Sequence, residues 1–294
     1  MAGFGSSLNE IQENQLKLIS QIRDEINYLI DQPEMSEVDA TLSRLLGYFS
    51  GRSQTLSVLV SDNYLLDAEI ILRSLNECFA KICFISYHDE IKKSSLVSEF
   101  WHQLGLANNH RKRHRAKKAE AFARALGKTD DEKVFRALSN EDLYDFTQMN
   151  RKDRKALEQK WSYSEIIKFL DSGVVRNAPP NAFGALTHMY GMQSHLAHCD
   201  QVALDLIADD ALREPEIRIK KGKAHVCRIW SDQISLWVFA YTALKSHFGE
   251  EVDYTASVWS DWEKHVTAMH PFTESFWETQ SDFYEEYAPR LQTH

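Results

Sequence analysis

Glycine and proline, the residues that most often interrupt helices and form tight turns, are scarce in this chain. Its 294 residues include 11 Gly and 6 Pro, about 6% together, whereas average usage of the pair is about 12%. Sandwiches, barrels and Rossmann folds need many tight turns, so this scarcity weighs against them. Apolar residues also recur every three to four positions along most of the chain, and the sequence therefore predicts a mainly α-helical bundle.

The apolar periodicity places most of the helices. It predicts helices over the ranges 6–31, 36–59, 62–88, 90–126, 162–170, 181–209 and 231–248. The helix over 62–88 is apolar on several sides, which is typical of a central helix. The periodicity breaks over 214–229, where we expect one small β-hairpin. Ile217 and Ile219 alternate there with charged residues, and Gly222 supplies a turn.

The clearest linker is the segment DSGVVRNAPP over 171–180. We expect it to join an N-terminal helical bundle, residues 1–172, to C-terminal helices with the β-hairpin, residues 173–294, the two parts packing as one domain. The C-terminal part ends in an acidic, aromatic stretch, in which ten acids and one lysine lie between residues 250 and 286. Because disordered acidic tails lack aromatic residues, this stretch is predicted to pack, as a regulatory or oligomerisation element.

Absent features exclude several classes of protein. The N-terminal segment MAGFGSSLNEIQENQ lacks the basic and apolar regions of a signal peptide, and no apolar run approaches the ~18 residues of a membrane span. The four cysteines form no C-x-x-C pair, which favours free thiols in the cytoplasm. Walker, G-x-G-x-x-G and G-x-S-x-G motifs are absent, and no ligand motif accompanies His195 and His198, so neither a cofactor nor a metal is expected.

Two charged residues, Arg73 and Glu77, interrupt the apolar stripe of the predicted helix over 62–88. They are four positions apart and therefore lie on one face of that helix. Charged side chains in such a place must be paired or hydrogen-bonded. Two interpretations stay open: a buried structural salt bridge, or a polar cluster that binds or polarises a substrate.

Tyr190, Ser194 and His198 stand at four-residue spacing on a second predicted helix. Their face is partly apolar, so these side chains need hydrogen-bond partners, and Arg73 and Glu77 are the natural ones. Such a site combines an acid/base (the histidine), a hydroxyl, a phenol and a fixed cation. These groups suit phosphodiester chemistry without a metal, or the binding of a small polar ligand. A buried network without chemistry is the alternative.

The motif Arg-Ser-x-x-Glu over 73–77 and the motif Tyr-x3-Ser-x3-His over 190–198 resemble those of a group of bacterial all-helical proteins. This group is loosely related to the HEPN (higher eukaryotes and prokaryotes nucleotide-binding) class of helical domains, and the resemblance covers roughly residues 63–202. It implies a helical fold with a polar cluster in its core, in a class that is often linked to toxins and phage defence.

A basic run, HRKRHRAKK over 110–118, holds six cations in eight positions. These cations are Arg111, Lys112, Arg113, Arg115, Lys117 and Lys118. The net charge of the chain is −9, but a local field of this density still attracts phosphate. At helical spacing the cations surround most of the helix, so a solvated charged helix is the alternative to RNA or DNA contact. An acidic partner, including the stretch over 250–286, is a third option.

Two functions follow from these patterns. The first is an effector that acts on or binds nucleic acid, RNA included, in phage defence or a toxin–antitoxin system; the polar cluster is then its site and the basic run its grip. The second is a non-catalytic helical interaction subunit of a defence complex, whose partner is another protein or a second copy of the chain. Exposure of the polar cluster favours the first function and full burial the second, and whether the chain is an enzyme is left open.

Overall fold

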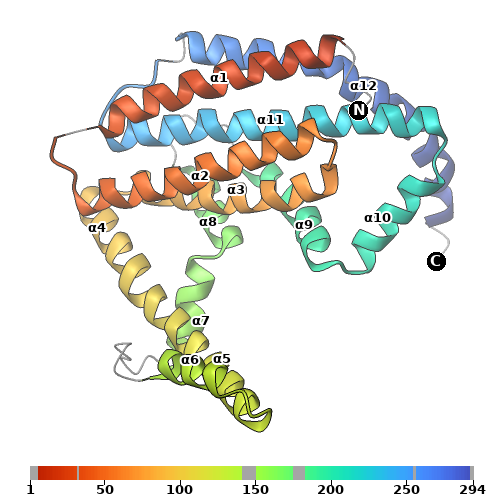
Figure 1. Cartoon of the computed structure of the whole chain (residues 1–294). Coiled ribbons are helices and arrows are strands. Elements are labelled where there is room, and N and C mark those ends of the chain that lie inside the picture. The colour runs from red at the N-terminus through yellow and green to blue at the C-terminus, as the bar shows by residue number, and fades with distance from the viewer. Residues whose placement is uncertain (1–5, 32, 141–149, 175–182, 254–255, 292–294) are drawn as a thin grey trace. The chain divides into compact units, whose positions relative to one another are not determined.

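The computed structural model of the chain describes residues 6–31, 33–140, 150–174, 183–253 and 256–291. Helices account for 88% of these residues, and no strand occurs among them. The predicted mainly α-helical fold is therefore confirmed (Figure 1). The chain divides into two compact units: unit 1 comprises residues 1–87 and 167–294, and unit 2 comprises residues 88–166.

The helices of unit 1 are α1 (Ser6–Ile30), α2 (Glu37–Ser61), α3 (Leu65–Ser86), α9 (Gly184–His198), α10 (Gln201–Leu212), α11 (Pro215–His247) and α12 (Ser257–Leu291). Unit 2 contains α4 (Glu90–Ser98), the π-helix η1 (Glu99–Gln103), α5 (Leu104–Ala125), α6 (Thr129–Ser139) and α7 (Arg151–Lys160). Helix α8 (Tyr163–Phe169) and the π-helix η3 (Leu170–Val174) carry the chain from unit 2 back to unit 1. The expected boundary at residue 172 falls inside η3, and residues 175–180 of the expected linker lie outside the described residues.

Helix α11 is the central element of unit 1. It packs against α1, α2, α3 and α12 (Figure 1). Its middle is buried, and two of the buried side chains there are tryptophans. The buried residues include Ile229, Trp230, Ile234, Trp237 and Leu244. Helix α3, the predicted central helix, is its neighbour and is also buried along most of its length. A helix that is apolar on most sides is stable only when other helices surround it.

The predicted β-hairpin over 214–229 is wrong, because Pro215 begins α11 and the helix continues through this whole segment. Proline is favoured in the first turn of a helix, where its missing N–H has no partner to lose. Gly222 lies within this helix, with open space where a Cβ would stand, so it makes no turn. The alternating isoleucines are a short coincidence, and packing of the buried residues Val226 and Trp230 decides the conformation.

A buried hydrogen-bond network joins four helices of unit 1. Gln15 of α1 donates Nε2–H to Oε1 of Gln233 on α11 at 2.7 Å. Gln233 Nε2 and Trp237 Nε1 both donate to Oγ of Ser53 on α2, each at 2.8 Å. His265 of α12 contacts Gln15 Oε1 through Nε2 at 3.0 Å. The network therefore fixes how α1, α2, α11 and α12 align.

The acidic, aromatic stretch forms most of α12, and the described part of it packs as expected. Val258, His265 and Met269 are buried, and α12 packs on α1 and α11. Trp259 and Trp262 stack edge to face at 5.7 Å between ring centroids. The side chains over 279–291 lie outside the described residues.

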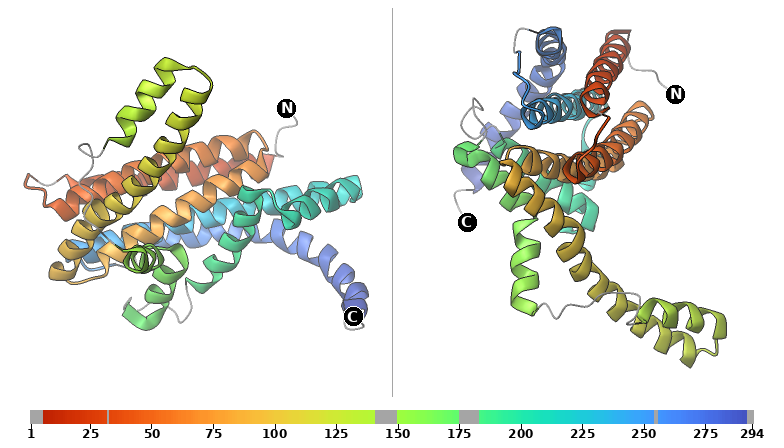
Figure 2. Two further views of the ribbon diagram at one scale, coloured as in Figure 1. Left: turned by 90° about the horizontal axis from the view of Figure 1, so that it is seen from below. Right: turned by 90° about the vertical axis from the view of Figure 1, so that its left-hand side faces the viewer.

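Unit 2 is built around an antiparallel helical hairpin, in which α5 and α6 lie side by side (Figure 2). The turn between them uses Gly127, whose φ of +68° lies in the left-handed region that favours glycine. Elsewhere in the unit, Glu99 of the π-helix η1 holds the end of α7. Its carboxylate accepts the indole N–H of Trp161 at 2.5 Å and the ammonium of Lys160 at 2.8 Å.

The structure also bears on the membrane and the cysteines. Over the described residues, no helix combines the length and the apolar character that a membrane crossing needs. All four cysteines are free, as predicted, and Cys199 alone is exposed. Burial raises the pKa of the Cys78 and Cys227 thiols to about 12, which makes them poor nucleophiles at neutral pH.

Replacing Gly222 by Ala tests the correction from hairpin to helix. In a helix the change removes backbone freedom from the unfolded chain, and we expect the free energy of unfolding to rise by about 0.5–1 kcal/mol. The matched control is Gly127→Ala, which places a Cβ at positive φ and is expected to destabilise. Urea titrations followed by circular dichroism measure both. A loss of stability in Gly222→Ala would mean that the segment turns there.

The pKa of His265 generates a prediction about pH. Burial lowers this pKa from 6.5 to about 4, so below pH 6.5 the unfolded chain takes up a proton that the folded chain does not. The free energy of unfolding therefore falls as pH decreases from about 6.5 to about 4, by up to about 1.4 kcal/mol per pH unit for this histidine. In His265→Gln that part of the slope is expected to disappear, whereas the exposed His198→Gln keeps it. An unchanged slope in His265→Gln contradicts the assignment.

Candidate functional site

Arg73, Glu77 and Tyr190 form one cluster between α3 and α9, as the sequence predicted for these three. The Tyr190 hydroxyl donates to Glu77 Oε1 at 2.7 Å and accepts from Arg73 Nη2 at 3.2 Å. Arg73 Nε lies 3.5 Å from the same Glu77 oxygen, and its guanidinium sits 4.9 Å from the centroid of the Tyr190 ring. Burial raises the pKa of Tyr190, so the phenol stays protonated and acts as a donor at neutral pH.

The Arg73–Glu77–Tyr190 cluster is half-exposed rather than enclosed. The side chains of Arg73 and Glu77 are 21% and 38% exposed. Ser194 lies one turn beyond Tyr190, and His198 is the exposed last residue of α9. Eight residues of helix span about 12 Å, so the structure does not bring His198 to the cluster. Within the described part of the chain, no hydrogen bond joins Ser194 to it either.

Helices α3, α9 and α11 share a second group of polar side chains, the core polar network, which comprises Glu69, Asn76, Gln193, His225 and Arg228. The Glu69 carboxylate is only 4% exposed; it forms an ion pair with Arg228 and contacts His225 Nε2 at 2.5 Å. Gln193 donates to its other oxygen at 3.0 Å and accepts from Asn76 at 3.3 Å. Both oxygens of the Glu69 carboxylate are thus satisfied, which a buried charge requires.

The charge state of His225 follows from its surroundings. Burial lowers the pKa of His225 to about 4, and the nearby positive charge of Lys221 acts in the same direction. The imidazole is therefore neutral at pH 7 and donates its Nε2–H to Glu69. Arg228 also pairs with Asp232, with Nη1 2.6 Å from Oδ2. The network is neutral at its histidine and ionic at its arginine.

The core polar network was not predicted, and the reason is identifiable. His225, Arg228 and Asp232 stand at positions i, i+3 and i+7, which is one face of a helix. Because the segment over 214–229 was expected to form a β-hairpin, this helical spacing was not considered there. Glu69 carried its own signal, since it lies four residues before Arg73 on the same face of α3.

The basic run lies on α5, and most of its cations are exposed. Lys112, Arg115 and Lys118 are exposed at three-residue spacing, so they point to one side of the helix. Arg111 is exposed and forms an ion pair with Glu158 of α7. Arg113 is half-buried. Most of the run is therefore in contact with solvent, which both a solvated charged helix and nucleic-acid contact require, and the row of Lys112, Arg115 and Lys118 is accessible to a ligand.

The charges of the chain are divided unequally between the units. Unit 2 holds 17 Lys and Arg against 13 Asp and Glu, a net charge of +4. The remainder holds 17 cations against 30 acids, a net charge of −13. Helix α7 adds a second basic segment, RKDRK over 151–155, in which Arg151, Lys152 and Lys155 are exposed. This segment was not among the predicted binding residues.

A shallow, open pocket of about 650 Å³ lies between α5 and α6. Its lining includes four cations, a hydroxyl and an amide: Arg113, Lys117, Lys133, Arg136, Ser139 and Asn140. We call it the cationic pocket. Among the residues that the structure describes, neither a carboxylate nor an aromatic ring lines it.

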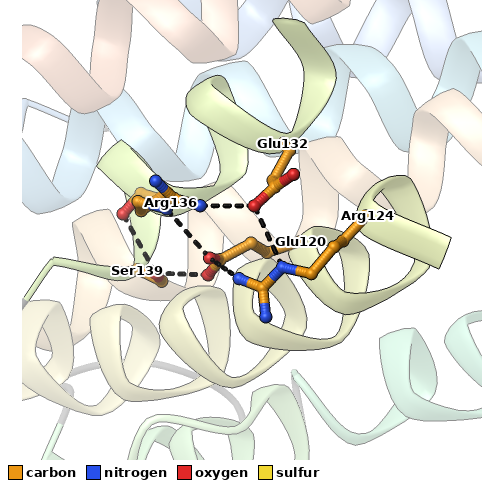
Figure 3. Close-up of polar contacts among 5 residues, drawn as sticks. All are labelled: Glu120, Arg124, Glu132, Arg136 and Ser139. Carbon is orange, nitrogen blue, oxygen red and sulfur yellow. Dashed lines mark hydrogen bonds and ion pairs between the residues drawn. The ribbon is translucent and has the colours of Figure 1, made fainter. Parts of the chain in front are cut away.

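Two arginines and two glutamates fasten α5 to α6 beside this pocket (Figure 3). Glu120 of α5 accepts from Arg124 at 2.8 Å and from Arg136 at 3.2 Å, both at Oε1. Glu132 of α6 accepts from Arg124 Nε at 3.0 Å and also from Arg136. Ser139 donates to the second oxygen of Glu120 at 3.3 Å. Hydrogen bonds from Arg124 hold the pKa of Glu132 below its usual range, so the cluster stays ionic.

The fold and these sites define a mainly helical protein in which an acidic helical unit is combined with a basic helical-hairpin unit. Residues 39–212, from α2 to the end of α10, match the Family of unknown function (DUF5677). The match covers more than half of the chain, which therefore belongs to this family. It contains the Arg73–Glu77–Tyr190 cluster and the cationic pocket, and it ends before α11. No curated protein and no solved structure matches the chain.

Glu69 and Glu77 lie on the same helix at different depths, which gives a matched pair of variants. Glu69→Ala removes the buried carboxylate that Arg228, His225 and Gln193 share, and Arg228 keeps its pair with Asp232. Removing one member of a buried pair costs about 3–5 kcal/mol, and because the Asp232 pair remains we expect a loss toward the lower end of that range. Glu77→Ala acts on a half-exposed group, and we expect a loss below about 1 kcal/mol. Chemical denaturation of the two variants measures the difference. Equal losses would show that the two carboxylates are not buried to different extents.

Proposed function

We propose that the protein binds nucleic acid, RNA in the first place, through unit 2. The observation that supports this most directly is the row of exposed cations on α5, Lys112, Arg115 and Lys118, in a unit of net charge +4. Cations in this arrangement neutralise successive phosphates and release counterions, which is the main source of sequence-independent affinity. The resemblance to HEPN proteins adds the proposal that such binding serves phage defence or a toxin–antitoxin system.

The net charge of the rest of the chain determines which unit binds the nucleic acid in this proposal. A net charge of −13 repels a polyanion, so binding is confined to unit 2. The proposal covers binding and includes no cleavage step. His198, the predicted acid/base, lies two helical turns from Tyr190, and Glu77 and Arg73 are held by each other and by the phenol.

A second candidate function has its own support. Helix α10 exposes four large apolar side chains, Val202, Leu204, Ile207 and Leu212. Exposed apolar surface of this kind marks protein interaction sites. The helix supports the alternative of a helical interaction subunit, in which α10 contacts a protein partner.

The salt dependence of binding tests the proposed function. We expect the log of the association constant for a single-stranded RNA to fall with the log of salt concentration, with a slope of about −0.7 per phosphate contact. In Lys112→Ala/Arg115→Ala/Lys118→Ala the slope becomes shallower by about 2, because about three contacts are lost. Fluorescence anisotropy of labelled RNA and DNA at several salt concentrations measures both quantities.

The control removes the same charge from unit 1. Lys17, Arg218 and Lys220 are exposed there, and their triple alanine variant is expected to keep the parent slope. If both triple variants lose affinity equally, only net charge matters and α5 is not the binding surface. Binding that is absent at low salt for both RNA and DNA overturns the proposed function and leaves the interaction subunit.

A further inference from the structure

The cationic pocket between α5 and α6 differs from the open face of α5 in its chemistry. Four cations line it, Arg113 and Lys117 from α5, and Lys133 and Arg136 from α6. The hydroxyl of Ser139, the amide of Asn140 and the methyl group of Ala137 complete the described lining. Every lining side chain except that of Ala137 can donate hydrogen bonds, so the pocket is suited to a compact ligand that only accepts them.

We propose that the cationic pocket binds the terminal phosphate monoester of a nucleic-acid strand, an inference that rests on the proposed function and deepens it. A phosphodiester within a strand carries one negative charge. A terminal monoester carries about 1.5 to 2 negative charges at pH 7 and offers three acceptor oxygens. Lys133 also pairs with Asp130 at 3.5 Å, and Arg136 with Glu120 and Glu132. The ammonium of Lys133 and the guanidinium of Arg136 have more N–H donors than these pairs use. A pocket lined by four cations therefore suits the three acceptor oxygens of the more highly charged monoester.

The lining residues also favour a phosphate over a base. Proteins hold unpaired bases by stacking them on aromatic rings, and the described lining residues include no aromatic ring. A base edge would also need acceptors for its amino groups, whereas the side chains that are described around the pocket are mostly cationic donors. The chemistry they support is phosphate recognition without sequence preference.

The ion-pair cluster of Figure 3 positions one of the pocket cations in advance. Arg136 donates from Nε to Glu120 and from Nη2 to Glu132, which holds its planar guanidinium in place. A guanidinium has five N–H donors, so donors remain for the phosphate. The bond to Glu120 raises the pKa of Arg136, and the cation is permanent. Such a preordered group loses little entropy when a ligand binds.

The test uses one single-stranded RNA sequence prepared with a 5′-phosphate, with a 3′-phosphate, or with hydroxyls at both ends. Anisotropy titrations at a fixed salt concentration compare the dissociation constants of the full-length protein. We expect one phosphorylated form to bind about tenfold more tightly than the hydroxyl form, because hydrogen bonds to charged groups are strong enough to give such a difference. The end that carries the effect identifies the strand polarity.

Two double variants separate the pocket from the rest of the surface. Lys117→Ala/Lys133→Ala removes two lining cations, one from each helix, and is expected to abolish the preference for the phosphorylated end. Lys112→Ala/Lys118→Ala removes two exposed cations that do not line the pocket. It is expected to weaken binding of all three RNAs by a similar factor and to keep the preference.

The outcomes distinguish this inference from the proposed function. If the parent protein binds all three RNAs equally, the pocket does not recognise an end and the inference is wrong, while nucleic-acid binding stands. If the preference survives in Lys117→Ala/Lys133→Ala, another site reads the phosphate and the inference also fails. If no RNA and no DNA binds at low salt, the proposed function fails and takes the inference with it.

Discussion

Unit 1 depends on the burial of a single carboxylate, that of Glu69 on α3. A charge held away from water costs several kcal/mol unless it is paired and hydrogen-bonded. The necessary groups come from two other helices, with Arg228 and His225 on α11 and Gln193 on α9. Pairing them with one carboxylate fixes how the three helices align along their axes. Because α11 also contacts α1, α2 and α12 through the Gln233 network and its packing, this alignment extends to the rest of the helical bundle.

Helix α11 supplies two of the partners of the Glu69 carboxylate, although it lies outside the region that matches the family. The matched region, 39–212, contains Glu69 and Gln193 but ends before α11. The carboxylate in the matched region is therefore neutralised by side chains outside it. Two polar groups of unit 1 differ in where their partners lie. All members of the Arg73–Glu77–Tyr190 cluster, which is half-exposed, lie within the matched region. The core polar network, in contrast, needs His225 and Arg228 of α11, which lie outside it.

In unit 2, ion pairs hold together two highly charged helices, α5 and α6. Its acids and bases are arranged so that Glu120 and Glu132 pair with Arg124 and Arg136 between α5 and α6. The arginines that form these pairs are Arg124 and Arg136, whereas the row of Lys112, Arg115 and Lys118 on α5 is exposed. The acids therefore hold the hairpin, and the exposed positive charge supports the proposed binding of phosphate.

The sequence by itself determined the helical class of this protein, and only the tertiary structure decided which polar groups meet. Scarce glycine and proline and the spacing of apolar residues are local properties, so they predicted most helices and the contact of Arg73 and Glu77, which lie one turn apart. The same local pattern suggested a hairpin over 214–229, and packing in the core made it helix. The pairing of Glu69 with His225 joins residues far apart in the chain, and no local spacing encodes such a contact, because it depends on how whole helices pack.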